Sequence, residues 1–396
     1  MDELIEQAFN DLFQWCRLRK FSGYDPFDGL NSRLFQSTPL KHSRTARLIQ
    51  TQVLKRSPLN LRQPLRVSPQ QNPKGIALFA LASLSNFRRL KTAEVESETR
   101  ELLENLVRTS ISGYNGSAWG YNFDWQNRNF FAPKGTPMIV PTAFAARAFL
   151  EAYETFKDED YLRIAQSACN FILLDLARSS ETDDRDGEFC FSYSPLDETR
   201  VFNSSLFAAE TLMCVGASTG DLAFKEQAQS LALSAAKYVL KRQRADGSWA
   251  YGSGNAQFWV DNFHTAYVLM SLSRIMQCSA GAIDLQPALQ RGYRFWRDSF
   301  FLADGWPKYY HDALYPADAH SAATAIVALV ELQHLDSEAM ALAERIAKWS
   351  LRNLRDGRGF FYYQRRRFYT VRTPFMRWTQ AWMLYALARL LEAKTL

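Results

Sequence analysis

The stretch Asp246-Gly247-Ser248-Trp249-Ala250-Tyr251 decides the fold, because variants of it return along the chain. An Asp-Gly pair favours a tight turn, and the aromatic residues after it favour a short extended segment. Similar segments lie at Gly116, Gly187, Gly305 and Gly357, so that successive turns are 71, 60, 58 and 52 residues apart. Each interval has room for two helices, which predicts a protein built from repeated helix pairs.

Apolar residues between the turns recur at helical spacing. The predicted helices cover about 74–90, 97–111, a pair between 144 and 174, 204–219, 224–242, 260–277, 285–301, 319–335, 338–355 and 377–393. The segments 2–20 and about 43–55 supply an irregular first pair, with a long loop within residues 1–73.

In most pairs one helix is apolar and rich in small residues while its partner is charged. This contrast is expected when the first helix is buried inside a ring and the second faces water. The last helix is apolar, whereas an open solenoid needs a polar terminal repeat. We therefore predict an all-α (α/α)6 toroid, a single domain over residues 1–396 with the turn-plus-aromatic segments at one mouth.

The composition narrows the class of protein. Aromatic residues make up 14% of the chain, which is high and predicts an aromatic-lined cavity. The net charge is +6, and the basic residues are scattered, with the densest cluster, Arg365-Arg366-Arg367, in a predicted turn. Without a basic stripe or a nucleic-acid motif, we predict no nucleic-acid partner.

The five cysteines show no CxxC spacing and predict neither a disulfide framework nor a zinc site. The acidic, amphipathic N-terminus does not resemble a signal peptide, and no apolar run is long enough to span a bilayer. These features predict a cytoplasmic protein without a membrane span. They leave the oligomeric state open.

Polar residues gather where the turn segments meet the predicted inner helices. The richest junction is Pro307–Ser321, followed by Trp259–Thr265. Histidine exchanges a proton near neutral pH, and a neighbouring carboxylate orients it. The candidate catalytic residues are His264, His311, His320, Asp261, Asp312 and Asp318. Asp261 and Asp318 are equally well placed to be helix N-caps.

The same mouth supplies candidates for substrate binding, because sugars stack on aromatic rings and anions are held by cations and helix N-termini. These candidates are Asp124, Trp125, Lys134, Asn203, Lys308, Tyr309, Tyr310, Tyr315, Arg377 and Gln380. Trp119 and Tyr121 are further stacking candidates, although they could equally pack the loop onto the ring. The spacing of the histidines matches no zinc motif, so we predict no metal and no cofactor.

The segment Gln243–Trp249 and the period of its repeats resemble the (α/α)6 superfamily of sugar epimerases, glucuronyl C5-epimerases, glycosidases and lyases. The junctions Phe123–Trp125, Pro133–Pro137, Asp261–Thr265 and Pro307–Ser321 look like those of bacterial proteins of exopolysaccharide biosynthesis. The likeness covers about residues 70–393. Terpene cyclases share the turn but have a DxDD motif, from which Asp183-Asp184-Arg185-Asp186 departs.

The resemblance implies an enzyme of polysaccharide biosynthesis or modification, acting on a sugar, oligosaccharide or polysaccharide. The leading hypothesis is an epimerase, isomerase or lyase that moves a proton next to a carboxylate or carbonyl. His311 or His320 would be the base, His264 the opposite acid, and Lys308, Lys134 or Arg377 would hold the anion. The alternatives are a glycoside hydrolase that uses two of the candidate aspartates and a non-catalytic glycan-binding or assembly protein.

Overall fold

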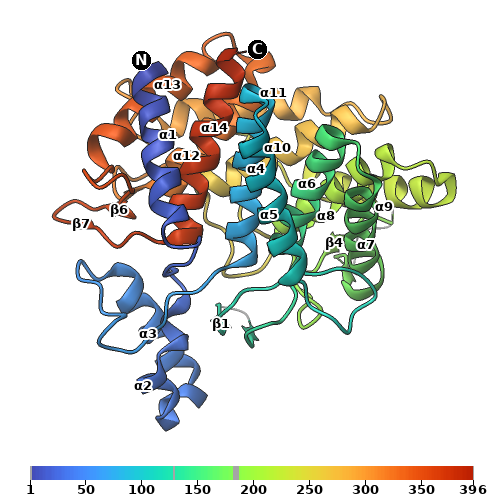
Figure 1. The fold of residues 1–396 in the computed structure, drawn as a ribbon. Coiled ribbons are helices and arrows are strands. Elements are labelled where there is room, and N and C mark those ends of the chain that lie inside the picture. Colours follow the sequence, from blue (N-terminus) through green and yellow to red (C-terminus); the bar gives the residue numbers. More distant parts are fainter. Residues whose placement is uncertain (1, 128–129, 182–186, 396) are drawn as a thin grey trace.

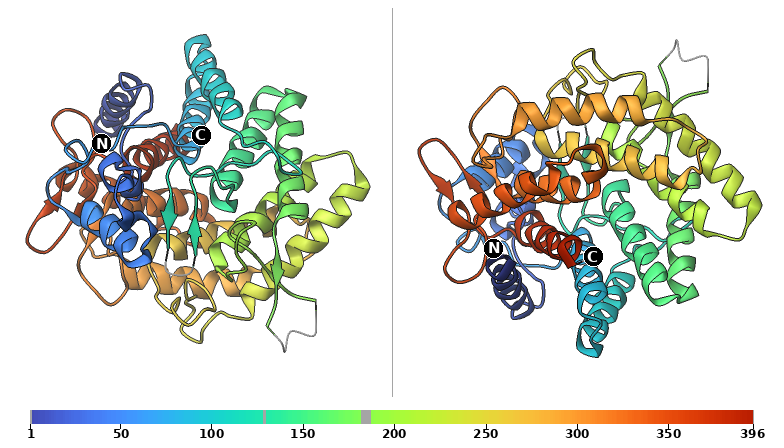
Figure 2. Two further views of the ribbon diagram at one scale, coloured as in Figure 1. Left: turned by 90° about the horizontal axis from the view of Figure 1, so that it is seen from below. Right: turned by 90° about the horizontal axis from the view of Figure 1, so that it is seen from above.

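The computed structural model describes residues 2–127, 130–181 and 187–395, and within them six helices form a closed inner ring. Each inner helix packs on the next, and the last packs on the first (Figures 1 and 2). The ring comprises α4 (Pro73–Leu90), α6 (Ile139–Phe156), α8 (Phe202–Ser218), α10 (Asn262–Cys278), α12 (Ala319–Glu331) and α14 (Trp382–Thr395). A π-helical turn, η4 (Met376–Ala381), leads into α14. The predicted (α/α)6 toroid is confirmed.

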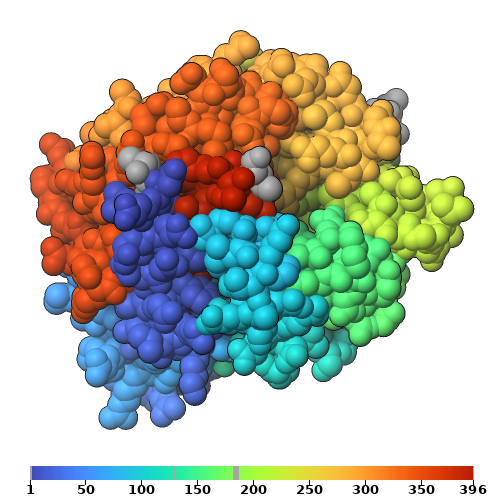
Figure 3. All heavy atoms as spheres, turned by 45° about the horizontal axis from the view of Figure 1, so that its top comes forward, coloured from blue at the N-terminus to red at the C-terminus, as the bar shows by residue number. Residues whose placement is uncertain are grey.

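Outer helices surround this ring. They are α5 (Ala93–Arg108), α7 (Glu159–Asp175), α9 (Leu222–Leu240), α11 (Gln286–Phe300) and α13 (Ala339–Asn353), followed in the ring by α1 (Asp2–Arg17). We predicted that segment 2–20 pairs with 43–55, and this is wrong. Helix α1 packs instead on α14, so the N-terminal helix lies against the C-terminal one (Figure 3).

The inner helices owe their position to their composition. Every residue of α12 from Ala319 to Val330 is buried, and five of these are alanines that let neighbouring helices approach closely. The outer helices are amphipathic. In α11, for example, Leu289, Tyr293 and Trp296 are buried, while arginines face the solvent.

The turn-plus-aromatic segments hold the two layers together. Gly247 has a φ angle of 93°, and a Cβ atom there would lie 2.5 Å from the carbonyl oxygen of Arg291 in α11. Glycine is therefore required at this turn. The indole N–H of Trp249 donates a hydrogen bond to the Val239 carbonyl at the end of α9. Trp119 donates in the same way to Leu106, and its side chain has no exposed surface, so it does not stack on a ligand.

Short strands complete the loops between the helices. They are β1 (Trp125–Gln126) with β2 (Phe131–Ala132), β3 (Arg178–Ser179) with β4 (Cys190–Phe191), and the three-stranded set β5 (Ala317–Asp318), β6 (Gln364–Arg365) and β7 (Thr370–Val371). A short 3-10 helix, η3 (Gln333–Leu335), follows α12. The segment Asp183–Asp186 lies outside the described residues.

Residues 29–72, which we call the cap, protrude from one mouth of the ring (Figure 1). They include all but the first residue of η1 (Asp28–Asn31), and also α2 (Arg33–Gln36), η2 (Pro39–His42) and α3 (Arg44–Arg56). Two buried ion pairs fasten this part of the chain. Arg62 binds Asp28 at 2.6 Å, and Arg377 binds Asp25 at 2.6 Å.

One prediction about the cysteines is wrong, because Cys214 and Cys278 form a disulfide bond. They lie 64 residues apart, near the ends of the adjacent inner helices α8 and α10, so the helical repeat brings them together where sequence spacing gave no sign. Cys16, Cys169 and Cys190 are free and buried, as expected of small apolar residues. No helix among the described residues has the length and apolar character needed to cross a membrane.

Candidate active site

A cavity of about 610 Å³ opens at the mouth where the inner helices begin. Its size is typical of sites for small ligands. Aromatic side chains dominate its wall, and polar groups interrupt them at the first turns of the inner helices. The aromatic lining consists of Phe27, Tyr121, Phe123, Trp125, Phe130, Tyr193, Tyr251, Trp259, Phe263, Tyr267, Tyr309, Tyr310 and Trp378.

Four of these tyrosines come from equivalent places in the repeat. Tyr121, Tyr193, Tyr251 and Tyr309 each lie at the end of a turn segment or just after it, and each precedes an inner helix. Within one turn segment the two aromatic residues have different surroundings. Trp249 is buried and donates to the outer helix α9, whereas Tyr251 lines the cavity. The hydroxyl groups of Tyr121 and Tyr193 lie 3.3 Å apart.

His264 and Asp261 form a hydrogen-bonded pair at the start of α10. The Nδ1 atom of His264 lies 2.7 Å from Oδ2 of Asp261, which also accepts a hydrogen bond from the indole of Trp259 at 3.0 Å. The other oxygen of Asp261 caps α10 by accepting from the backbone N–H of His264. Because Nδ1 donates to the carboxylate, Nε2 is left as the basic nitrogen of an imidazole that lines the cavity.

His320 is held differently. Its Nδ1 lies 2.9 Å from the carbonyl oxygen of Trp378, and its Nε2 lies 2.8 Å from the hydroxyl of Tyr267. Burial and the nearby Lys74 ammonium lower the pKa of His320 well below the ordinary value. A neutral His320 with Nδ1–H accepts a hydrogen bond from the Tyr267 hydroxyl at Nε2. The His320 ring lines the cavity, but both of its nitrogens already have protein partners.

His264 and His320 do not face each other across the ring. They lie on the neighbouring helices α10 and α12, and the ring of Phe263 contacts both imidazoles, with centroids 4.1 Å and 4.7 Å away. The helix three places from α10 in the ring is α4, whose first turn carries Lys74, another residue of the cavity wall.

Lys74 enters the cavity among aromatic rings. Its Nζ lies 4.5 Å from the ring centre of Phe144 and 5.4 Å from that of Tyr267. Burial, reinforced by the charge of Arg377, lowers the pKa of Lys74 well below the ordinary value for lysine. Lys74 therefore has a neutral amine available for proton transfer under conditions in which an exposed lysine stays charged.

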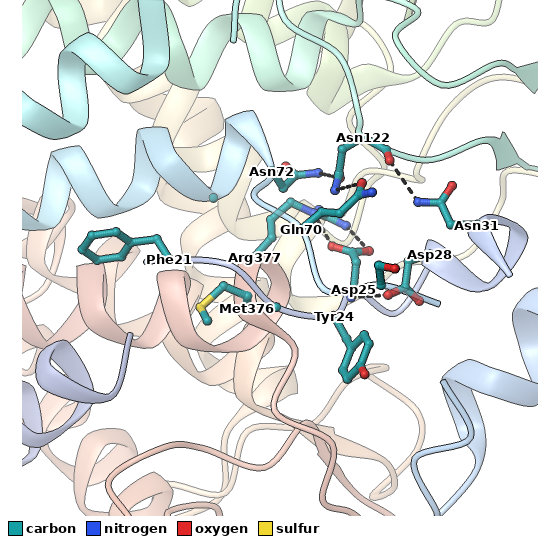
Figure 4. Close-up of a pocket in the computed structure, with 13 residues that line it drawn as sticks. Phe21, Tyr24, Asp25, Asp28, Asn31, Gln70, Asn72, Asn122, Met376 and Arg377 are labelled. Carbon is teal, nitrogen blue, oxygen red and sulfur yellow. Dashed lines mark hydrogen bonds and ion pairs between the residues drawn. The ribbon is translucent and has the colours of Figure 1, made fainter. Parts of the chain in front are cut away.

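Arg377, in η4, is fixed by Asp25 through two hydrogen bonds, Nε to Oδ2 at 2.6 Å and Nη2 to Oδ1 at 2.8 Å (Figure 4). The guanidinium lies over the ring of Tyr121, 5.0 Å from its centre. Around this pair Asn72 donates to Asn122, which donates in turn to the side chain of Gln70. A rigid polar network thus holds one cation at the cavity wall.

The cap adds a second cationic region to the mouth. Lys55 and Arg56 of α3 line the cavity, and Nζ of Lys55 lies 4.3 Å from the ring centre of Phe27. Desolvation lowers the pKa of Lys55 to about 8. Asp261 is the only carboxylate among the described residues that line the cavity, whereas Lys55, Arg56, Lys74 and Arg377 are basic. This charge balance favours an anionic ligand.

Eight predicted site residues line this one cavity, His320 and seven others. The others are Asp261, His264, Trp125, Asn203, Tyr309, Tyr310 and Arg377. The sequence patterns missed Tyr193, Tyr251, Tyr267, Trp378 and the contribution of the cap. A tyrosine two to four residues after the first aromatic residue of the turn segment was the signal that could have identified Tyr193, after Phe189, and Tyr251, after Trp249.

Eight other predicted site residues lie away from the cavity wall. They are Asp124, Lys134, Lys308, His311, Asp312, Tyr315, Asp318 and Gln380.

Five of these eight residues take part in hydrogen bonds that hold the loops in place. Asp124 accepts a hydrogen bond from the backbone N–H of Lys134, and Lys308 donates from Nζ to the carbonyl of His311. Gln380 makes two hydrogen bonds with the backbone of Phe361.

The remaining three residues are Asp312, Tyr315 and Asp318. Asp312 is exposed, and the ring of Tyr315 packs on Trp306 with centres 5.1 Å apart. Asp318 caps α12 by accepting from the N–H of Ser321. Burial raises the pKa of Asp318 to about 6. Among the described residues no group of three or more His, Cys, Asp or Glu side chains is placed to hold a metal ion.

Residues 115–256 match the family model described as the D-glucuronyl C5-epimerase C-terminus. The match covers less than half of the chain and includes Tyr121, Tyr193, Tyr251 and Asn203 of the cavity wall. No curated protein sequence matches the chain at a significant level.

Solved structures share the fold at low sequence identity. Cellobiose 2-epimerase from Bacillus thermoamylovorans is 12% identical with a TM-score of 0.61, over 83% of this chain and 90% of that one. An unsaturated glucuronyl hydrolase from Bacillus sp. GL1 is 14% identical with a TM-score of 0.61, over 98% and 97%. A D-mannose isomerase is 13% identical with a TM-score of 0.59, over 82% and 87%. Family match and fold together support a carbohydrate-active enzyme that acts on a sugar.

Proposed function

We propose that the protein is a sugar epimerase, isomerase or lyase that removes a proton from a carbon next to a carboxylate or carbonyl group. The observation that carries this proposal is the His264–Asp261 pair, whose imidazole lines an aromatic cavity together with the lysine Lys74. We further propose that the substrate is a sugar or uronic-acid unit of an oligosaccharide or polysaccharide, because the cavity is aromatic, open at its mouth and rich in cations.

In this mechanism His264 and Lys74 work on opposite faces of the sugar. Asp261 holds Nδ1–H of His264, so that Nε2 accepts the proton from the substrate carbon. An ammonium on Lys74 then returns a proton to the other face, which inverts the carbon. In the reverse direction, the neutral amine of Lys74 is the base and the imidazolium of His264 is the acid.

The negative charge that develops on the substrate oxygen needs a donor. Arg377 is fixed by Asp25, so its remaining N–H groups are ordered before the substrate binds. A preorganised donor stabilises an enolate-like intermediate without further reorganisation. The Tyr267 hydroxyl donates its one hydrogen to His320, so His320 is a positioning residue that fixes the Tyr267 ring in the cavity wall, while His311, away from the cavity, has no part in this proposal.

The geometry gives less support to a glycoside hydrolase. Two carboxyl groups must flank the bond that is broken, but of Asp124, Asp261, Asp312 and Asp318 only Asp261 lines the cavity. A glycan-binding protein would need only the aromatic wall, and the hydrogen-bonded His264–Asp261 pair would have no role in it.

Solvent-deuterium exchange tests the proposal. The protein is incubated in deuterated water with oligosaccharides that contain uronic acids, and the sugars are analysed by mass spectrometry and NMR. We expect deuterium at one sugar carbon, and no incorporation with a His264→Gln variant. New reducing ends without deuterium at carbon would favour hydrolysis, and retention of the sugars by the inactive protein without any exchange would favour glycan binding.

The biological process and the cellular location of the reaction are also proposals. We propose a role in polysaccharide biosynthesis on the strength of the family resemblance. The Cys214–Cys278 bond argues against the predicted cytoplasmic location, since disulfide bonds persist mainly in oxidising compartments. Fractionation of cells that produce the full-length protein would decide the location.

A further inference from the structure

The charge of the chain is less evenly spread than we predicted. The cap, residues 29–72, contains eight lysine and arginine residues and not one aspartate or glutamate. Arg62 is paired with Asp28, just outside the cap, whereas Arg33, Lys41 and Arg66 form no ion pair with a described residue. The cap is therefore a strongly positive projection on a ring that carries the acidic residues of the chain.

The same projection exposes large aliphatic side chains. Their exposed fractions are 42% for Leu34, 54% for Leu40, 58% for Ile49, 50% for Val53 and 70% for Leu59. Isolated exposed aliphatic side chains are ordinary on protein surfaces, but five within 26 residues of a basic segment are not.

Helix α3 shows the arrangement most clearly. Ile49 and Val53 lie one turn apart and point outward, while the side of the helix turned to the protein buries Thr51 and Leu54. Arg56 continues the outward face. An apolar stripe with a cation at its end faces solvent, which is the reverse of the usual amphipathic helix.

The hairpin between β6 and β7 extends this surface. The hydroxyl of Tyr369 donates to the carbonyl of Arg56 at 3.2 Å, so the hairpin adjoins the end of α3. Its tip carries Arg366 and Arg367 beside Phe368, whose exposed fraction of 85% is the highest of the large apolar residues that the structure describes.

We propose that the cap and this hairpin dock the protein on an anionic phospholipid surface. A bilayer offers negative head groups to the lysines and arginines and an apolar boundary to the aliphatic side chains. A second copy of this chain that approached with its own cap would bring equal positive charge and be repelled. A nucleic acid or a polyanionic glycan would engage the cations but would leave the leucines, Ile49 and Val53 in water.

Docking would also place the cavity near the membrane. Leu48, Gln52, Lys55 and Arg56 of α3 line the cavity mouth, while Ile49 and Val53 are neighbouring positions on the same helix. A protein seated on its cap would therefore hold its mouth beside the lipid surface. This inference does not depend on the proposed chemistry.

Vesicle sedimentation with the full chain tests it. Vesicles of phosphatidylcholine alone are compared with vesicles that also contain phosphatidylglycerol. We expect binding only to the anionic vesicles, weakening as salt is added. The double variant Ile49→Ser/Val53→Ser should bind roughly tenfold more weakly, and Arg33→Gln roughly fivefold more weakly.

Leu174→Ser/Leu222→Ser is the matched control, because these leucines are 66% and 70% exposed on the outer helices α7 and α9. It should bind like the unchanged protein. Equal binding to neutral vesicles, no binding to either kind, or equal losses in the two double variants would overturn the proposal. Binding to soluble heparin or DNA at the same affinity, unaffected by Ile49→Ser/Val53→Ser, would instead identify a polyanion-binding surface.

Discussion

Nδ1 of His264 lies 2.7 Å from one oxygen of Asp261, while the other oxygen of this carboxylate accepts the backbone N–H of His264. One side chain thus caps α10 and orients the imidazole that lines the cavity. The two tasks can be separated by mutation, since asparagine caps helices as well as aspartate does but carries no charge to support an imidazolium.

We expect Asp261→Asn to leave the fold intact and to lower the rate of proton exchange roughly 10²- to 10⁴-fold. The rate is measured as deuterium incorporation, and the fold by thermal unfolding. Asp318→Asn is the matched control, because Asp318 caps the neighbouring inner helix α12 but does not line the cavity. Equal losses of activity in both variants would mean that the cap, and not the imidazole, matters.

Substitutions of Lys74 distinguish proton transfer by its amine from binding of an anion by its charge. Lys74→Arg keeps a cation at the start of α4 but cannot lose its proton, and Lys74→Met keeps the length of the side chain without charge. If Lys74 exchanges a proton with the substrate, both variants should lose exchange activity by roughly 10²- to 10⁴-fold. Full activity in Lys74→Arg with loss in Lys74→Met would show that Lys74 only holds an anion.

The toroid was predictable because its determinants are local and repeated. Each Asp-Gly turn, each aromatic anchor such as Trp249 and each alanine-rich inner helix can be recognised without its neighbours. The partner of α1 was not predictable in this way. Closure of the ring pairs α1 with α14 from the other end of the chain, and nothing in the local pattern of either helix specifies that contact.

The site was predictable where a residue type and the repeat agreed, as for His264 and Asp261 at the start of α10. The prediction failed at the Pro307–Ser321 junction, where proximity in sequence suggested that all the polar residues form one cluster. The loop turns instead, so that Tyr309 lines the cavity while His311 packs against Phe295. Lys55 was missed because a helix of the cap reaches the mouth from outside the repeat.

The Cys214–Cys278 bond predicts a specific thiol count. Unfolded without reductant, the protein should show three reactive thiols, from Cys16, Cys169 and Cys190, and five after reduction. The bond closes a loop with a sequence separation of 64, which corresponds to about 4 kcal/mol of unfolding free energy in the chain-entropy model.

Reductant should therefore lower the stability of the unchanged protein and leave Cys214→Ala/Cys278→Ala unaffected. Urea unfolding with and without reductant measures both. Five reactive thiols before reduction would contradict the bond.

Asp318 should make stability depend on pH between about 4 and 6. Burial raises its pKa to about 6, from the ordinary value of 3.8 for an aspartate in an unfolded chain. Between these values the folded protein holds a proton that the unfolded chain has released, so the free energy of unfolding falls as pH rises. The full difference corresponds to about 3 kcal/mol.

Asp318→Asn removes the titrating group but keeps a side chain able to cap α12. Its free energy of unfolding, measured in urea at pH values from about 4 to about 7, should fall less than that of the unchanged protein. Asp312→Asn, at an exposed position of the same loop, should follow the unchanged protein. Burial also raises the pKa of Asp28 to about 6, so part of the dependence of unfolding free energy on pH remains in both variants. Identical slopes in Asp318→Asn and Asp312→Asn would show that Asp318 is ionised in the folded protein throughout this range.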